Sequence, residues 1–255
     1  MADLAAIRHR SLVEYLQGAR FAGVEELAQV LGVTQQTVRK DLDLLASRRL
    51  LTRVRGGAML ESRLDNIGYS TRRAIAAHAK DAIGRKAAEL LPNNASLFLN
   101  IGTTTEAVAR NLLDHEHLLV VTNNLNVADI LAQNSRIEVI VAGGRLRAND
   151  RAVIGSLTVD FIKGFKVDYA VIGTSALDAD GDLLDFDINE VTVSQTIIAQ
   201  ARKVMLVADA TKFERQAPAR IGSLSDIDLF VTDTIADDER TRLVQRHNVD
   251  IVTAL

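Results

Sequence analysis

The sequence predicts an α/β protein in two parts: a winged helix-turn-helix domain, then a Rossmann-like α/β domain with a mostly parallel sheet. Three observations favour this fold class. In the first sixty of 255 residues, three short helical patterns precede alternating apolar and basic residues. Beyond residue 75, short apolar runs alternate with helical patterns, which is typical of βαβ units. Hydrophobic residues make up 47% of the chain, enough for a sizeable core.

Composition excludes several kinds of site. The chain contains no cysteine, which rules out disulfides, thiolate metal ligands and a cysteine nucleophile. No apolar run approaches the roughly 18–20 residues that span a membrane, and the N-terminus lacks the apolar core of a secretory signal. We therefore expect a cytoplasmic protein with no membrane partner.

The net charge of −3 conceals a basic N-terminal region. Residues 1–60 contain nine Lys or Arg and six acidic residues, so this part carries +3 and the remainder carries −6. A basic region on an acidic body indicates an anionic partner for that region alone.

The first fifty residues predict a helix-turn-helix. Helical spacing from Leu4 stops at Gly18, a second helix spans 24–31 before Gly32, and Thr34 is placed to cap a third helix over 35–46. The N-terminal half of a third helix contacts base edges in the major groove. Candidate DNA-binding residues there are Thr34, Gln35, Gln36, Thr37, Arg39 and Lys40.

The stretch "LLTRVRGGAM" predicts a short hairpin, or wing, with Arg53 and Arg55 on one side. Such arginines hold phosphates or enter the minor groove. We expect Gln35, Gln36, Thr37 and Arg39 to read bases, and Lys40, Arg53 and Arg55 to hold the DNA backbone. A small helical domain with a solvated charged face is the alternative, which the agreement of spacing, capping and charge disfavours.

These residues resemble a known family. "TQQTVRKDLDLL" followed by "LLTRVRGGA", with Arg8, Leu12 and Leu16 ahead of them, is similar to the DNA-binding domain of the deoxyribose operon repressor (DeoR) family. The chain departs from the family at "SRRLL", where a glycine often follows the recognition helix. The resemblance implies a transcriptional repressor of double-stranded operator DNA, with a DNA-binding domain over 1–59, a linker over 60–74 and an effector domain over 75–255.

The second part predicts seven strands with helices between them. The helices are expected near 104–113, 125–133, 155–163, 189–202 and 237–247. The strands are expected over 97–101, 118–122, 137–142, 169–173, 204–208, 229–232 and 250–253. In such sheets, ligands bind beyond the carboxyl ends of the strands.

Polar loops follow these strands at one edge of the sheet. Glycines, hydroxyls, amides and cations beside helix N-termini are the parts of a phosphate site, and Asn123, Asp187 and Glu190 offer hydroxyl partners. Individually, each feature also fits a capped helix, a tight turn or a surface cation. The candidate effector-binding residues are Asn100, Gly102, Thr103, Thr104, Thr105, Asn123, Gly143, Gly144, Arg145, Thr174, Asp187, Glu190 and Lys212.

The family resemblance continues through these loops, at "GTTT", "TNN", "GGRLR", "DFDINE" and "DATKF". It implies a C-terminal domain similar to ribose-5-phosphate isomerase that binds a phosphorylated polyol or sugar and needs no cofactor. A narrower likeness is to the branch of the family that represses the glycerol 3-phosphate regulon, which resembles this chain in having Asn at the position of Asn100. That likeness implies glycerol 3-phosphate as the effector, and a regulator of another sugar-phosphate pathway is the alternative.

An enzyme is the competing interpretation, because Glu190 and Lys212 lie where isomerase relatives shuttle a proton. A complete DNA reader argues against it, so we expect no catalytic residues. We also expect no metal site, since His115 and His117 lack a third ligand nearby and are interpreted as exposed loop residues. A single winged domain makes few DNA contacts, so a homodimer or homotetramer is expected.

Overall fold

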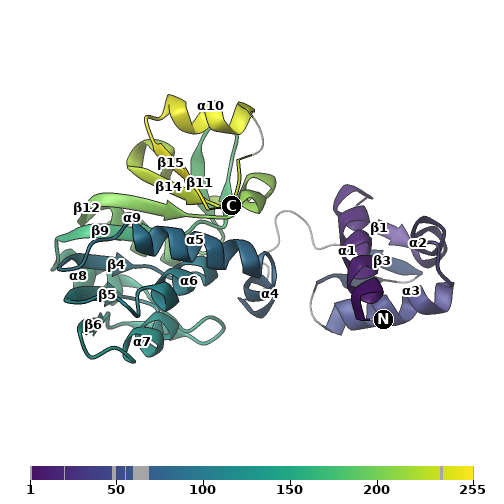
Figure 1. Cartoon of the computed structure of the whole chain (residues 1–255), viewed down its shortest axis with the longest axis horizontal. Helices are drawn as coiled ribbons and strands as arrows, with labels where there is room; N and C mark the ends of the chain where they lie inside the picture. Colours follow the sequence, from purple (N-terminus) through teal and green to yellow (C-terminus); the bar gives the residue numbers. More distant parts are fainter. Residues whose placement is uncertain are drawn as a thin grey trace. The chain divides into compact units, whose positions relative to one another are not determined.

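The computed structural model describes residues 2–19, 21–47, 50–54, 56–59, 69–235 and 238–254. The chain divides into two compact units, Met1–Arg72 and Arg73–Leu255, whose elements are labelled in Figure 1. Most of the predicted linker, residues 60–68, lies outside the described residues, while its last six residues form helix α4 (Tyr69–Ala74). No helix within the described ranges is long and apolar enough to cross a membrane.

The N-terminal unit has the elements of a winged helix-turn-helix. In chain order these are α1 (Ala2–Ala19), β1 (Phe21–Gly23), α2 (Val24–Leu31), α3 (Gln35–Ser47), β2 (Thr52–Val54) and β3 (Gly57–Met59). The antiparallel strands pair in the order β1-β3-β2, so the predicted wing hairpin gains a third strand that the sequence pattern did not indicate. The apolar stripes of the three helices meet in one core around Leu12, Leu27 and Leu42.

The C-terminal unit is built on a seven-stranded parallel sheet in the order β15-β14-β12-β9-β4-β5-β6. The strands are β4 (Ser96–Leu99), β5 (Leu118–Thr122), β6 (Ile137–Val141), β9 (Val167–Ile172), β12 (Ala201–Val207), β14 (Leu229–Thr232) and β15 (Asp250–Thr253). All seven predicted strands are therefore present, with ends displaced by up to three residues.

Helices cover both faces of this sheet because successive strand side chains point to opposite sides. Leu97 and Leu99 pack under α5 (Ala77–Glu89), α6 (Thr103–Asn111) and α7 (Leu125–Leu131), whereas Phe98 packs under α8 (Ser156–Lys163) and α9 (Ile188–Ala199). Helix α10 (Asp238–Arg246) adds Val244 to the second core. Figure 1 shows α5 and α6 side by side on one face.

Two small antiparallel sheets interrupt the predicted loops. One is the hairpin β7 (Arg145–Arg147) with β8 (Ala152–Ile154). The other pairs β10 (Ala176–Leu177), β11 (Asp182–Asp185) and β13 (Ala219–Ser223), and two short helices, η1 (Ala210–Glu214) and η2 (Leu224–Asp226), flank β13 in sequence. These stretches are predicted as loops from the sequence, because strands this short carry little periodicity.

The strand order changes direction at β4. From β4 the chain adds β5 and β6 on one side, and then β9 pairs with β4 on the other side. Such a reversal separates the connecting loops at the carboxyl ends and opens a crevice there, which is the usual ligand position in parallel sheets. The residues after β4, β5, β9 and β12 surround this point, which we call the carboxyl edge.

Candidate functional site

The predicted recognition helix presents a polar face to solvent. Val38, Leu42 and Leu45 are buried on one side of α3, while the side chains predicted to contact DNA lie on the other. Five of these are exposed and Thr37 is half-buried; the exposed ones are Thr34, Gln35, Gln36, Arg39 and Lys40. This division between faces is what a helix lying in a major groove requires.

Thr34 caps this helix as predicted. Its Oγ1 accepts a hydrogen bond from the Thr37 backbone N–H at 3.2 Å, which satisfies one of the donors left unpaired at a helix start. The Arg39 guanidinium lies 3.4 Å from the Gln35 side-chain oxygen, a weak contact that leaves the guanidinium exposed.

Asp41 joins the first and third helices. Its carboxylate accepts hydrogen bonds from Arg8 at 2.5 and 3.0 Å and from the His9 ring at 2.9 Å, and the residue is 7% exposed. Burial alone would raise the pKa of Asp41, but the bonds from Arg8 and His9 outweigh it and lower the pKa below its usual value. The Arg8–Asp41 pair therefore fixes α3 against α1.

The wing arginine is held within the domain. Arg53 Nε lies 3.1 Å from Asp43 on α3, and its Nη1 donates to the Gly57 carbonyl at 3.2 Å. Arg55, the other predicted backbone contact in the wing, lies outside the described residues. Arg53 thus ties the hairpin to the recognition helix, and a phosphate contact would have to share its guanidinium.

At the carboxyl edge, Asn100 is buried, and both its amide nitrogen and its amide oxygen are hydrogen-bonded. Its amide nitrogen donates to Ser194 Oγ at 2.8 Å, and its amide oxygen accepts from the Ile101 backbone N–H at 2.7 Å. These bonds join the end of β4 to α9, so the side chain positions the loop that leads into α6.

Helix α6 begins without a side-chain cap. A side-chain oxygen caps α7 (Asn124), α9 (Asp187) and η1 (Asp209), whereas α6 begins at Gly102, with φ 139°, and no side chain caps it. Helices α5 and α8 likewise begin without a side-chain cap. The Thr105 hydroxyl donates back to the Gly102 carbonyl at 2.7 Å instead. Thr103 is half-buried beside it, and Thr104 and Thr105 are buried. The first N–H groups of α6 are therefore available to an anion.

Two buried oxygen atoms at this edge have no hydrogen-bond donor among the described residues: Asn123 Oδ1 and Asp209 Oδ2. The Asn123 amide nitrogen donates to the Val153 carbonyl at 3.1 Å, which fixes the orientation of the amide. Asp209 Oδ1 accepts from the Thr211 N–H at 3.2 Å, and both residues with unsatisfied oxygens are 1% exposed. A buried acceptor without a donor is unfavourable, so both atoms need a donor from a ligand or from water.

The glycine pair after β6 packs against α8. The Thr158 hydroxyl donates to the Gly143 carbonyl at 3.0 Å, and a Cβ on Gly144, where φ is 149°, would lie 2.1 Å from the same hydroxyl. Arg145, which follows on β7, is exposed.

Thr174 is buried after β9 and donates to the carbonyls of Ala176 and Leu184, so its hydroxyl supports the small antiparallel sheet.

Arg147 binds three carboxylates. Its guanidinium contacts Asp150 at 2.6 and 2.9 Å, Asp187 at 2.7 Å and Glu190 at 2.6 Å. These bonds raise the pKa of Arg147 despite its burial. For Asp187, burial is outweighed by the bonds from Asn189 and Arg147, so its pKa is lowered. Asp187 and Glu190, predicted as hydroxyl partners, are thus committed to an arginine to which the sequence analysis gave no separate role.

Lys212 lies on η1, three residues after Asp209, and is half-buried. It shares the carboxyl edge with the loops after β4 and β5, as predicted from the strand pattern.

No group of three or more His, Asp or Glu side chains within the described ranges is arranged to hold a metal ion. His115 is not the exposed loop residue expected: it is half-buried, and its Nε2 lies 3.0 Å from the Leu91 carbonyl.

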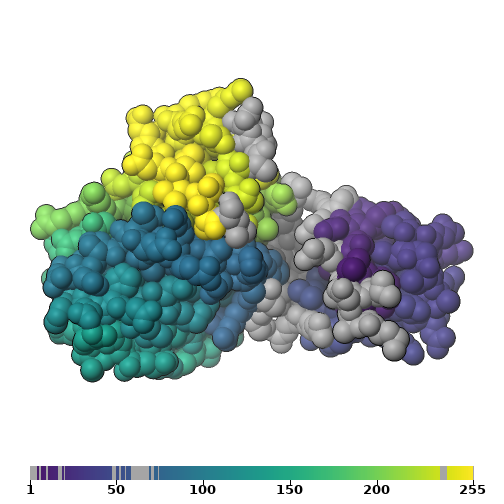
Figure 2. Space-filling model, viewed as in Figure 1, coloured from purple at the N-terminus to yellow at the C-terminus, as the bar shows by residue number. Residues whose placement is uncertain are grey.

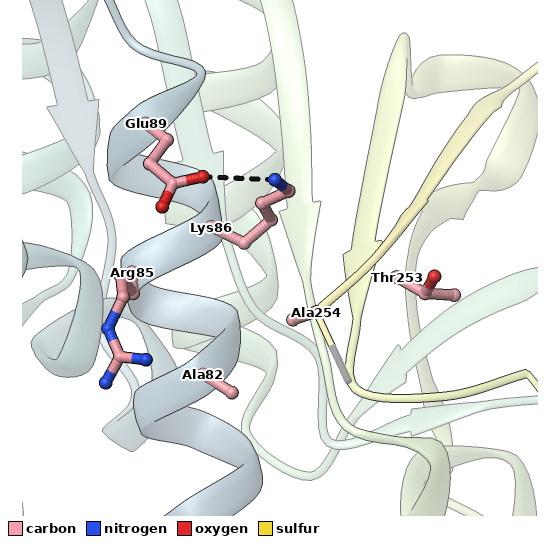
Figure 3. Close-up of a pocket in the computed structure, with 6 residues that line it drawn as sticks. All are labelled: Ala82, Arg85, Lys86, Glu89, Thr253 and Ala254. Carbon is pink, nitrogen blue, oxygen red and sulfur yellow. Dashed lines mark hydrogen bonds and ion pairs between the residues drawn. The ribbon is translucent and has the colours of Figure 1, made fainter.

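A shallow depression of about 270 Å³ lies away from these residues. It is lined by Ala82, Arg85, Lys86, Glu89, Thr253 and Ala254, and Figure 3 shows Lys86 paired with Glu89 across one turn of α5. Figure 2 shows this face of the unit, where the α5 segment (blue) borders the C-terminal segment (yellow). None of the predicted effector-binding residues lines this depression.

Comparison with known proteins covers nearly the whole chain. Residues 8–63 match the DeoR-like helix-turn-helix domain, and residues 75–234 match the DeoR C terminal sensor domain. The glycerol-3-phosphate regulon repressor of Haemophilus influenzae is 43% identical over 94% of this chain and 96% of its own length. Its Escherichia coli counterpart is 41% identical over 96% and 97%, and the Escherichia coli HTH-type transcriptional repressor CsqR is 37% identical over 96% and 94%.

Similarity to solved structures is much lower. Ribose 5 phosphate isomerase A from Neisseria gonorrhoeae aligns with 54% of this chain and 53% of its own at a TM-score of 0.39 and 14% identity. The assignment therefore rests on the two domain matches and on the relatives that align end to end. The chain belongs to the DeoR family of transcriptional regulators, with a helix-turn-helix domain followed by a sensor domain.

Proposed function

We propose that the chain is a transcriptional repressor that binds double-stranded operator DNA and is released by a phosphorylated small metabolite, with glycerol 3-phosphate favoured. Two relatives more than 40% identical are named glycerol-3-phosphate regulon repressors, which supports the effector class. A regulator of another sugar-phosphate pathway is the second candidate, since CsqR, a transcriptional repressor 37% identical to this chain, is not named for glycerol 3-phosphate.

One arrangement carries the effector part of this proposal: a helix start without a side-chain cap beside a buried acceptor without a donor. The N–H groups of Thr103 and Thr104 at the start of α6 would bind the phosphate, because a helix N-terminus combines donors with positive potential. Asn123 follows β5, the strand next to β4, and adjacent strands in a sheet lie about 5 Å apart. Its Oδ1 would accept a hydrogen bond from a hydroxyl of the ligand. Glycerol 3-phosphate carries both groups on a three-carbon chain.

Gly143, Gly144 and Arg145 would border the phosphate, and Lys212 would add positive charge from the opposite side of β4. Asn100, Gly102, Thr105 and Thr174 would shape the loops rather than bind, since their polar groups already have internal partners. Asp187 and Glu190 would act through Arg147.

We propose that the sensor unit does not catalyse a reaction on its ligand. A general base works best with a pKa near the working pH, whereas Asp187 has a lowered pKa and Glu190 is paired with Arg147. Glycerol 3-phosphate also has no carbonyl group to enolise, and the relatives aligned along their full length are repressors.

On DNA, Gln35, Gln36, Thr37 and Arg39 would read bases while Lys40 and the wing arginines hold the backbone. One winged unit buries too little surface for tight specific binding, so we propose a homodimer or homotetramer on repeated half-sites. The protein would act in the cytoplasm, where its operator is.

A panel of phosphorylated metabolites tests the proposal. The full chain is melted with glycerol 3-phosphate, glycerol, and several sugar phosphates, and its affinity for a duplex selected from a random library is measured by fluorescence anisotropy. We expect glycerol 3-phosphate alone to raise the melting temperature and to weaken duplex binding. Another compound doing both would assign the other pathway, and no response to any compound would refute the sensor role.

A further inference from the structure

Two large apolar side chains protrude from the sensor unit at the starts of α8 and α9. Leu157, in the first turn of α8, is 72% exposed, and Ile188, the first residue of α9, is 64% exposed. They are the two most exposed large apolar side chains among the described residues. Single exposed apolar residues are ordinary on a protein surface, whereas a group of them indicates contact with a partner.

Helices α8 and α9 lie side by side and run in the same direction. Each leads into a strand, α8 into β9 and α9 into β12, and these two strands are parallel neighbours. The ends of the helices are adjacent, because Lys166, just after α8, donates from its Nζ to the Ala199 carbonyl of α9 at 2.9 Å. Leu157 and Ile188 therefore lie at the opposite ends of these helices, toward the carboxyl edge, and the axes of helices packed in this way are about 8–10 Å apart.

The β7–β8 hairpin extends this surface. Leu146, 52% exposed, lies opposite Val153 in the hairpin. A Cβ on Gly144 would meet both Val153 and the first turn of α8, so this face of the hairpin lies against the start of that helix. The three most exposed large apolar side chains described in the sensor unit thus surround the starts of two helices, and we call them the apolar patch: Leu146, Leu157 and Ile188.

The surface around the apolar patch is neutral. Among the α-helices described in the sensor unit, α9 alone has no charged side chain on its exposed face, since its single charged residue, Glu190, is buried and paired with Arg147. The exposed charges of α8 are Asp160 and Lys163, which pair with each other at 3.1 Å. Depletion of charge is what distinguishes the core of a protein interface from the rest of the surface.

This neutrality favours a second copy of the chain as the partner. In a twofold dimer a surface meets an identical surface, so a patch with one sign of charge repels itself and a neutral patch does not. A nucleic acid or a charged protein would find no opposite charge here. We propose that a second copy of this chain covers the apolar patch, in a contact between sensor units. This inference rests on the proposed homodimer or homotetramer and does not depend on which effector binds.

The helix in this contact is also bonded to the carboxyl edge. Asn100, at the end of β4, donates to Ser194 of α9 at 2.8 Å, and Arg147 holds Glu190 in the first turn of the same helix. The helix that meets the second copy is therefore joined by hydrogen bonds to the loops where we propose that the effector binds.

Variants that place a charge in the apolar patch test this contact. Sedimentation velocity over a range of concentrations compares the unmodified full chain with Leu157→Arg, Ile188→Arg and Ile188→Glu. Leu90→Arg is the matched control, since Leu90 is an exposed leucine at the end of α5, on the other face of the sheet. Thermal melting of each variant establishes that it is folded.

We expect the dissociation constant for self-association to rise at least tenfold in the three patch variants and to stay unchanged in Leu90→Arg. An equimolar mixture of Ile188→Arg and Ile188→Glu should associate again, because opposite charges then meet, whereas a folding defect would not be repaired by mixing. Patch variants that associate like the unmodified chain, or a mixture that stays dissociated, would overturn this contact alone. An unmodified chain that is monomeric at every concentration would refute the proposed homodimer as well.

Discussion

The predicted recognition helix α3 and the carboxyl edge use polar residues in opposite ways. On α3 most of the side chains predicted to contact DNA are exposed and have few internal partners, so the helix keeps its fold from the buried stripe around Val38 and Leu42. At the carboxyl edge most polar side chains are buried and hydrogen-bonded to remote elements. Substitution of these exposed residues on α3 should therefore change DNA binding and leave the stability unchanged. At the carboxyl edge, a substitution should change ligand binding and stability together.

The largest change in stability is expected at the carboxyl edge, where the polar groups are buried. Arg147→Ala leaves the carboxylates of Asp150, Asp187 and Glu190 together without their cation. Removing one partner of a buried ion pair costs about 3–5 kcal/mol; because the Arg147 side chain is 21% exposed, we expect the lower end of that range. Urea unfolding of the sensor unit measures it. Arg151→Ala, which breaks an exposed pair with Asp129, is the control and should cost under about 1 kcal/mol.

The exposed side is tested by Arg39→Ala. Loss of one base contact should weaken specific duplex binding by about 1–3 kcal/mol and leave unfolding within about 0.5 kcal/mol of the original chain. Anisotropy on specific and scrambled duplexes separates loss of specificity from loss of charge, with Arg85→Ala on the sensor unit as the charge-matched control. Unchanged specific affinity would contradict the assignment of α3 as the reading helix.

Thr104→Ala tests the start of α6, where one substitution should change both the effector affinity and the stability. The side chain is buried, and we expect effector affinity to fall by about 1 kcal/mol. Lys212→Ala should weaken the response as well. Thr192→Ala serves as the control because Thr192 is an exposed threonine on α9. Thermal titration with glycerol 3-phosphate measures all three, and full retention of affinity in Thr104→Ala would exclude the Thr104 hydroxyl from the site.

The smallest effect concerns pH and the N-terminal unit. The pKa of Asp41 is below its unfolded value of about 3.9, so the unfolded state binds this proton more readily. The stabilisation is complete above about pH 5 and is lost as the pH falls through the folded-state pKa. Asp41→Asn should remove this part of the acid dependence. The free energy of unfolding of both proteins is measured from pH 3 to 7. The same slope against pH in both would refute this role of Asp41.

The comparison also explains which parts of the molecule were predictable. The recognition helix, its Thr34 cap and the seven strands follow from local patterns, since periodicity and capping depend on residues within one or two turns. The third strand of the wing sheet and the two small sheets were missed, because two or three residues cannot show a period. Loop composition indicates candidate ligand residues, but it does not show which of their polar groups are already hydrogen-bonded within the fold.

The family, the two-part architecture and the edge of the sheet where polar loops gather are all recognisable in the amino-acid sequence. How those polar groups are used depends on the folded structure. Asn100 bonds Ser194, 94 positions away, and Arg147 bonds Glu190, 43 positions away, so neither pairing follows from spacing. The close packing of α5 on α6 arises in the same way from contact between Gly84 and Ala107, 23 positions apart. Hydrogen bonds and ion pairs act over a few ångströms in space, and the fold alone sets those distances.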